Sequence, residues 1–122
     1  MPSDQYSFEP AGFGPSLWFV LHTAAASAPT VLTPADRAAW RATLTNLHAL
    51  IPCKTCRINY IKKLSHIDLD NWLRTRDDLF DLTVRIHNSV NGALGKPIFS
   101  PTAAAKAYGK GTARGVRVPR RH

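Results

Sequence analysis

The stretch TRDDLFDLTVRIHNSVNGALGKP, residues 75–97, decides the fold that this sequence predicts. Its apolar side chains return at intervals of three and four residues, which places them on one face of an α-helix. Thr75 and the aspartates after Arg76 are typical of a helix start, Gly95 is a candidate C-terminal cap, and Pro97 stops the helix. We therefore predict a long helix with a buried stripe formed by Leu79, Leu82, Thr83, Ile86, Val90, Ala93 and Leu94.

The N-terminal half of the chain predicts two further helices. The first has Pro15 in its first turn, where the missing N–H costs nothing, and it ends before Pro29. The second begins at Thr33-Pro34-Ala35-Asp36, a capping-box arrangement in which Asp replaces the usual Glu, and it runs to about Ile51.

Two more helices complete the pattern. Pro52 ends the second helix, and Cys53 falls at the first positions of the third. This third helix continues at helical spacing through Ile58, Ile61 and Leu64. A short segment over residues 69–73 precedes the long helix, and a last short helix covers residues 100–108. Because alternating strand patterns and hairpin turns are absent, we predict an all-α fold, a four-helix bundle with a short fifth helix.

Length and composition predict one domain. A chain of 122 residues with 44% apolar content can bury one modest core. The longest apolar run, residues 17–28, falls short of the roughly 20 residues of a membrane span and lacks the basic leading segment of a signal peptide. We expect no secretory targeting, a flexible segment over residues 1–13, one domain over residues 14–108, and a disordered basic tail over residues 109–122.

The net charge of +8 belongs mostly to the C-terminal end. Residues 106–122 hold six Lys or Arg and no acid, whereas residues 1–105 hold ten basic and eight acidic side chains. The folded part therefore carries only +2. A basic tail of this kind binds polyanions without sequence specificity or simply adds solubility, so the charge does not define the function.

The two cysteines of the chain lie in the motif Cys53-Lys54-Thr55-Cys56. At a helix start, the helix dipole and the nearby Lys54 and Arg57 favour the thiolate form, which is the reactive form in thiol–disulfide exchange. Spacing alone leaves three interpretations open: a redox pair, half of a zinc site, or two incidental cysteines. Zinc needs four ligands, and the spacings of His48, His66 and His87 match no common zinc pattern.

A second polar group lies at the C-terminal end of the long helix. His87 and Asn91 are four residues apart and share a face, with Asn88 beside them. Asn is a poor helix former, so two of them here indicate either a polar ligand held against the bundle or a solvated face with one core histidine. Trp18 and His22 form a similar pair on the first helix, for which a core tryptophan with a satisfied histidine is the plainer interpretation.

Taken together, these motifs resemble the Erv/ALR family of flavin-linked sulfhydryl oxidases. Order and spacing agree across residues 13–108, and Tyr108 falls where the family has an aromatic residue near the end of its last helix. The matching segments are Phe13-Gly14, Trp18-Phe19-Val20-Leu21-His22, Pro52-Cys53-Lys54-Thr55-Cys56, His87-Asn88-Ser89-Val90-Asn91 and Leu94-Gly95-Lys96-Pro97.

The resemblance implies FAD bound at the end of the bundle and a thiol oxidase that makes disulfides in proteins and reduces O2 to H2O2. Cys53 would exchange with the substrate, and Cys56 would lie beside the flavin and pass electrons to it. The resemblance assigns Gly14, Trp18 and His22 to the flavin. It assigns the rest of the FAD site to His87, Asn88, Val90, Asn91, Leu94, Lys96 and Tyr108, with no metal. The alternative from another class is a zinc- or nucleic-acid-binding helical module that uses the motif, nearby histidines and the tail.

The sequence departs from the family in charge and in cysteines. Pro15 stands where some members carry an Arg, which leaves Lys96, with Lys54 or Lys62, to face the FAD phosphates. The extra cysteines common in cellular members are missing, so Cys53 must be reached directly by substrate proteins or by a small thioredoxin-like carrier. The minimal form resembles versions from large cytoplasmic DNA viruses, which implies the host cytoplasm or the virion; the mitochondrial intermembrane space is the alternative. The family also implies a noncovalent homodimer.

Overall fold

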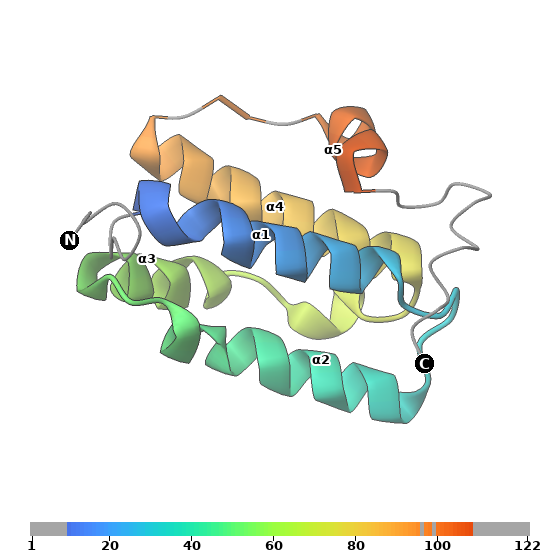
Figure 1. Cartoon of the computed structure of the whole chain (residues 1–122). Coiled ribbons are helices and arrows are strands. Elements are labelled where there is room, and N and C mark those ends of the chain that lie inside the picture. Colours follow the sequence, from blue (N-terminus) through green and yellow to red (C-terminus); the bar gives the residue numbers. More distant parts are fainter. Residues whose placement is uncertain (1–9, 96, 99, 109–122) are drawn as a thin grey trace.

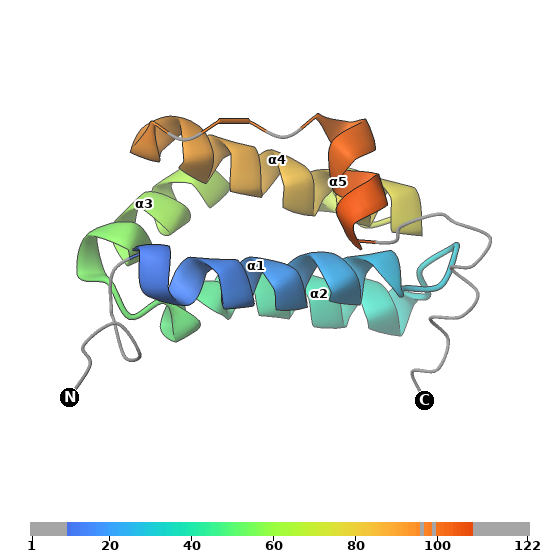
Figure 2. The same cartoon turned by 45° about the horizontal axis from the view of Figure 1, so that its top comes forward.

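The computed structural model describes residues 10–95, 97–98 and 100–108. Within these ranges the regular structure is helical, apart from one isolated antiparallel bridge between Val31 and Thr75. Four longer helices form the bundle, and α5 packs against α1 and α4 (Figures 1 and 2). The elements are α1 (Pro10–Ala26), α2 (Pro34–Asn46), η2 (Leu47–Leu50), α3 (Lys54–Leu64), η3 (Leu69–Trp72), α4 (Arg76–Leu94) and α5 (Pro101–Tyr108). The predicted all-α bundle with a short fifth helix is confirmed.

Helix α4 has the predicted ends. The Thr75 side chain accepts a hydrogen bond from the Asp78 N–H at 3.1 Å, and Asp77 adds a second carboxylate to the first turn, where the helix dipole favours negative charge. At the other end Gly95 has φ 74°, the left-handed conformation that glycine adopts without steric cost.

Helix α2 has the predicted start but an earlier end. Thr33 and Asp36 exchange two hydrogen bonds of 3.1 Å, which confirms the capping box. The α-helix ends at Asn46, and the turn η2 continues the chain to Leu50. Pro52 disfavours a helical conformation at the preceding residue, and Ile51 is extended, with ψ 111°, so η2 does not continue past Leu50.

Helix α1 starts five residues earlier than predicted. It begins at Pro10, so Pro15 lies inside the helix instead of in its first turn. Pro15 lacks the N–H that would bond the carbonyl of residue 11, and the start of α1 is therefore held by one hydrogen bond fewer. Residues 10–13 belong to α1, which shortens the predicted lead-in; residues 1–9 and the predicted tail lie outside the described residues.

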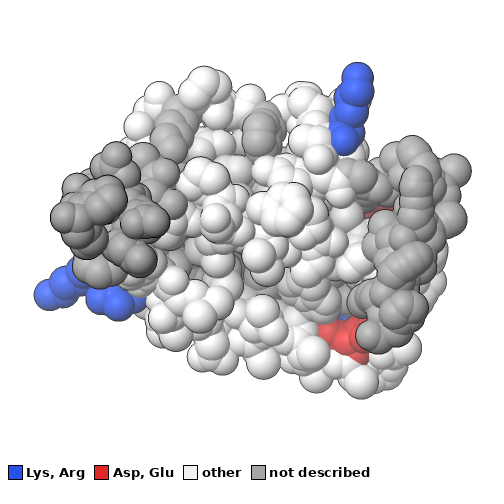
Figure 3. Space-filling model, in the orientation of Figure 1, with Lys and Arg blue, Asp and Glu red and all other residues white. Residues whose placement is uncertain are grey.

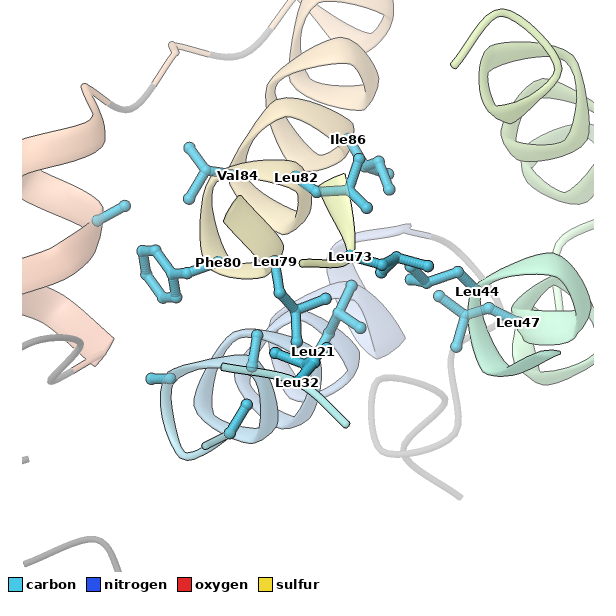
Figure 4. Close-up of a cluster of buried hydrophobic side chains, with 14 of the residues drawn as sticks. Leu21, Leu32, Leu44, Leu47, Leu73, Leu79, Phe80, Leu82, Val84 and Ile86 are labelled. Carbon is cyan, nitrogen blue, oxygen red and sulfur yellow. The ribbon is translucent and has the colours of Figure 1, made fainter. Parts of the chain in front are cut away.

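The core lies where α4 faces the other helices (Figure 4). Leu79, Leu82 and Ile86 of α4 are almost completely buried, and each such side chain contributes roughly 1.5–3 kcal/mol to folding. They form one cluster with Leu21, Leu32, Leu44, Leu47, Leu73 and Phe80. Further along the same stripe, Val90 is half-buried and Leu94 is 44% exposed. The apolar face of α4 therefore changes from core to open surface towards its C-terminus.

Helix α3 contributes Tyr60 to this core, with its hydroxyl donating a hydrogen bond to the Leu44 carbonyl. Burial raises the pKa of the Tyr60 phenol well above its usual value, so the side chain stays neutral. Ile58 and Ile61, by contrast, point outward from the bundle and are about half exposed. Among the described helices, none is both long and apolar enough to cross a membrane.

Candidate active site

Cys53 and Cys56 form a disulfide at the start of α3. Cys53 is the N-cap residue of the helix, and its sulfur accepts a hydrogen bond of 3.2 Å from the Cys56 N–H. Their Cα atoms are 5.2 Å apart, a separation that a disulfide spans readily. Lys54 is exposed and Arg57 half-buried beside them, and residues 52–67 contain no acid. This cationic helix start stabilises a thiolate when the bond is broken.

A cavity of about 540 Å³ opens beside the disulfide. Much of its lining comes from the first half of α1, from α3 and from the C-terminal half of α4, which lie at one end of the bundle (Figure 1). Its volume falls within the roughly 300–1,000 Å³ of small-molecule and cofactor sites. The wall is mostly apolar, with a few polar side chains. Its lining residues are Phe13, Gly14, Pro15, Leu17, Trp18, Phe19, Leu47, Ile51, Cys56, Asn59, Tyr60, Lys63, His87, Val90, Asn91, Ala93, Leu94, Pro97, Ile98 and Tyr108.

The two cysteines differ in their relation to this cavity. Cys56 belongs to its wall, whereas Cys53 does not. Because the two sulfurs are bonded, any reaction that breaks the bond at one sulfur also changes the charge and bonding of the other. A group held in the cavity would therefore contact the disulfide at Cys56; both cysteines are half-buried.

Aromatic side chains from three helices meet beside the cavity. The rings of Trp18 (α1) and His87 (α4) lie nearly parallel, with centroids 4.0 Å apart and an interplanar angle of 10°. Tyr108 of α5 lies against His22, at 4.5 Å and 41°. The pairing of α1 with α4 and the placement of α5 across them thus create flat apolar surfaces of the kind that planar ring systems bind.

A chain of hydrogen bonds supports this stack from within the core. Thr83 donates to the Phe80 carbonyl at 2.7 Å, so its oxygen accepts from Nδ1 of His22, 2.9 Å away. His22 Nε2 then accepts from Nδ1 of His87 at 2.8 Å. The order of donors assigns the tautomers of both rings: each histidine carries its proton on Nδ1.

His22 is fully buried. Burial, and after it the charge of His87, lowers the pKa of His22 from 6.5 to about 4. His22 is therefore neutral near pH 7, as its accepting role towards His87 requires. Its place is behind the stack, where it holds His87 in one orientation.

The structure brings most of the predicted cofactor residues together. Eight of them line the cavity: Gly14, Trp18, Cys56, His87, Val90, Asn91, Leu94 and Tyr108. His22 does not line it but supports His87 from the core, as described above. Asn88 faces a separate, shallower hollow with Trp72, Asp81 and Arg85 because it lies one residue around the helix from the His87 face. Lys96 lies outside the described residues.

Lys54 and Lys62, suggested as phosphate contacts, are exposed and do not line the cavity, whereas Lys63 does. Lys63 belongs to a set on α3 that the sequence interpretation missed, with Asn59 and Tyr60. These residues follow Cys56 by three, four and seven positions, the spacing of one helix face, so this periodicity could have identified them. Leu47 and Ile51 also line the cavity, but their position depends on the packing of η2 against the bundle. No sequence periodicity predicts it.

The residues present fit FAD. The cavity has the size of a cofactor site, its aromatic faces suit planar rings, and Lys63 with Asn59 and Asn91 supplies polar groups for phosphates and ribose. The Cys53–Cys56 disulfide reaches the wall through Cys56. The same geometry disfavours the zinc alternative, since the thiols are consumed in a disulfide, and the described residues hold no cluster of three His, Cys, Asp or Glu side chains that could bind a metal ion.

Comparisons with known proteins agree with this site. Residues 15–109 match the model of the Erv1 / Alr family. A Frog virus 3 (isolate Goorha) protein, 088R, whose name describes it as an FAD-linked sulfhydryl oxidase, is 41% identical over 111 residues, covering 88% of this chain and 73% of that protein.

Two solved structures are similar in fold. The yeast Erv1 core has a TM-score of 0.76 and 26% identity, covering 85% of this chain and 86% of that one. The FAD binding domain of Erv1 from Saccharomyces cerevisiae has a TM-score of 0.72 and 27% identity, covering 79% and 90%.

Proposed function

The chain belongs to the Erv1 / Alr family, and on this basis we propose that it oxidises substrate thiols at the Cys53–Cys56 disulfide and delivers the electrons to FAD held in the adjoining cavity. It is an FAD-linked thiol oxidase. The observation that carries the mechanism is the position of the disulfide: Cys56 is in the cavity wall and Cys53 is outside it.

The exchange at Cys53 needs only groups of this chain and the substrate. A substrate thiolate attacks the Cys53 sulfur, a mixed disulfide forms, and Cys56 leaves as the thiolate. The second substrate thiol loses its proton and attacks the mixed disulfide at the substrate sulfur, which releases Cys53 as a thiolate. The substrate has then lost two electrons and formed its disulfide, and the Cys53/Cys56 pair has gained the same two electrons.

The surroundings of the disulfide favour these steps. Both leaving thiolates form at the N-terminus of α3, whose dipole and neighbouring Lys54 and Arg57 stabilise negative charge. A good leaving group speeds exchange, since the rate rises as the pKa of the departing thiol falls.

We assign the binding of FAD to the cavity lining. Trp18, His87 and Tyr108 offer flat surfaces to its rings, and Lys63 and Asn91 offer polar contacts, with His22 as the buried support of His87. When bound, FAD supplies the two-electron oxidation that returns the cysteine pair to the disulfide and transfers the electrons to O2, forming H2O2. The residues of this chain would position that group, exclude water from it with the apolar wall, and present Cys56 to it.

The biological setting is proposed from the same comparisons. The Frog virus 3 relative supports a viral enzyme acting in the host cytoplasm or the virion, with the mitochondrial intermembrane space as the alternative. We propose protein thiols, or a small thioredoxin-like carrier, as substrates. We also propose a noncovalent homodimer formed through α1 and α2, supported by exposed apolar and small side chains there: Phe19, Val20, Ala38 and Ala39.

One preparation tests the function directly. Purified protein is expected to be yellow, to release FAD on denaturation, and to consume O2 when dithiothreitol is added. A colourless protein that contains stoichiometric zinc and consumes no O2 would contradict the oxidase.

A further inference from the structure

The solvent-facing side of α3 is both apolar and basic. Residues at steps of three and four along the helix form one stripe, which we call the α3 outer face: Lys54, Arg57, Ile58, Ile61 and Lys62. Ile58 and Ile61 expose 52% and 48% of their surface, and the two lysines are exposed. Single exposed apolar residues are ordinary, but two adjacent isoleucines framed by cations form a patch.

This stripe has no part in the cavity. The residues of α3 that line the cavity, Cys56, Asn59, Tyr60 and Lys63, lie on the opposite side of the helix. The helix therefore separates two surfaces, one towards the bound cofactor and one towards solvent.

The α3 outer face starts at the disulfide. Cys53 is the N-cap of α3, so Lys54 and the stripe behind it border the sulfur that substrate thiols reach. Figure 3 shows cationic side chains projecting at the end of the molecule where α3 begins. Asp70 pairs with Arg41, and within the described residues no ion pair is seen between a cation of α3 and a carboxylate. The charge of the α3 cations is available to an incoming molecule.

We propose that the α3 outer face is the docking surface for protein substrates, and that it selects proteins whose thiols are flanked by acidic residues and an aliphatic side chain. The inference rests on the proposed function, because it takes Cys53 as the site of exchange. Opposite charges raise the rate of encounter and orient the partner, and burial of Ile58 and Ile61 slows its departure. Because the surface borders Cys53, we favour a protein that carries a thiol as its occupant over nucleic acid, which carries none.

Synthetic dithiol peptides measure this selectivity. Three peptides share a central Cys-Gly-Pro-Cys and a leucine on each side, and differ only in flanking residues: aspartate, serine or lysine. At low ionic strength we expect kcat/KM for the aspartate peptide to exceed that for the lysine peptide by at least about 10-fold, and the ratio to shrink towards one at about 0.5 M salt. Equal kcat/KM for the three peptides would overturn the proposal.

Variants on the α3 outer face tie the selectivity to its residues. Lys62→Glu should abolish or reverse the preference for the aspartate peptide, and Ile61→Ser should lower kcat/KM for all three leucine-containing peptides. Arg74→Glu makes the same charge change in the loop beside Leu32, away from α3, and should leave the preference intact. A preference that survives Lys62→Glu would overturn the proposal.

Dithiothreitol separates this proposal from the oxidase function itself. It reaches Cys53 without a docking surface, so its oxidation rate should be unchanged in Lys62→Glu and Ile61→Ser. Loss of dithiothreitol oxidation in the unmodified protein would refute the oxidase function, whatever the peptides show. A single-stranded oligonucleotide that binds more tightly than the aspartate peptide, and loses binding in Lys62→Glu, would assign the surface to nucleic acid and overturn the docking proposal.

Discussion

His87 donates its Nδ1 proton to Nε2 of His22, across 2.8 Å between α4 and α1. One ring, His87, faces the cavity and stacks on Trp18, while the other is fully buried and bonded to Thr83. The cavity wall therefore continues into the core as a chain of polar groups. Its behaviour can be tested separately from catalysis.

Replacing Thr83 by valine should loosen the stack. The change keeps the shape but removes the acceptor of the His22 Nδ1 proton, which leaves a buried N–H unsatisfied at a cost of about 1–3 kcal/mol. Denaturant unfolding of the FAD-free and FAD-bound protein measures the loss, and nitrogen NMR of labelled histidines reports whether both rings keep the Nδ1–H tautomer. Thr83→Ser retains the hydroxyl and should keep both tautomers; a loss in Thr83→Ser larger than that in Thr83→Val would mean that the methyl group, and not the hydroxyl, carries the effect.

His22 should also make stability depend on pH. Its pKa is about 4 when folded and 6.5 when unfolded, so between these values the unfolded chain binds a proton that the native state does not. The stabilisation is complete above pH 6.5 and is lost as pH falls towards 4. The shift sets an upper limit of roughly 3.5 kcal/mol, since each pKa unit corresponds to about 1.4 kcal/mol. Urea unfolding from pH 7 to pH 4.5 should show a steeper decline than in His22→Gln; parallel curves would contradict the assignment.

Trp18 should carry much of the FAD affinity. Trp18→Ala removes the ring that stacks with His87 and should weaken FAD binding by about 10-fold or more, a loss in keeping with the worth of an aromatic contact plus its buried area. Trp18→Phe should retain most of the affinity. Trp72, which lies under Arg85 and outside the cavity, provides the control: Trp72→Ala should leave the Kd for FAD unchanged. Isothermal titration of the FAD-free protein measures all three.

The neighbouring lysines of α3 should have opposite functions. Lys63 lines the cavity and Lys62 faces solvent, so Lys63→Gln should weaken FAD binding and reduce its salt dependence, whereas Lys62→Gln should do neither. Titrations of FAD at low and moderate salt test this pair. If Lys62→Gln had the larger effect on the Kd for FAD, the orientation of α3 described here would be wrong.

The sequence predicted the fold well where a local signal exists. Thr33, Thr75 and Gly95 each terminate a helix through bonds to their own neighbours, so their spacing was sufficient. The start of α1 was misjudged because both Pro10 and Pro15 satisfy the rule for a first-turn proline, and local sequence does not choose between them. The apolar stripe on α4 has the predicted periodicity. Periodicity does not distinguish a residue of the core from a residue of the cavity wall, however, and Val90 and Leu94 belong to the wall.

The site was predictable mainly through its motifs. Cys56, His87 and Asn91 were identified, and they line one cavity. His22 can support His87 from the core because it also bonds the Thr83 hydroxyl. The sequence pattern places Thr83 in the apolar stripe of the long helix and gives no sign of this bond. Such a contact joins helices far apart in the chain, and no spacing within one helix reveals it.

The central claim is that Cys56 connects the disulfide to bound FAD while Cys53 meets the substrate. Loss of the flavin's visible absorbance after anaerobic addition of dithiothreitol tests it most directly, in the unmodified protein and in Cys56→Ser. The account predicts rapid bleaching in the first, and in the second a protein that keeps its FAD but remains yellow. Bleaching of Cys56→Ser at a rate close to that of the unmodified protein would contradict it.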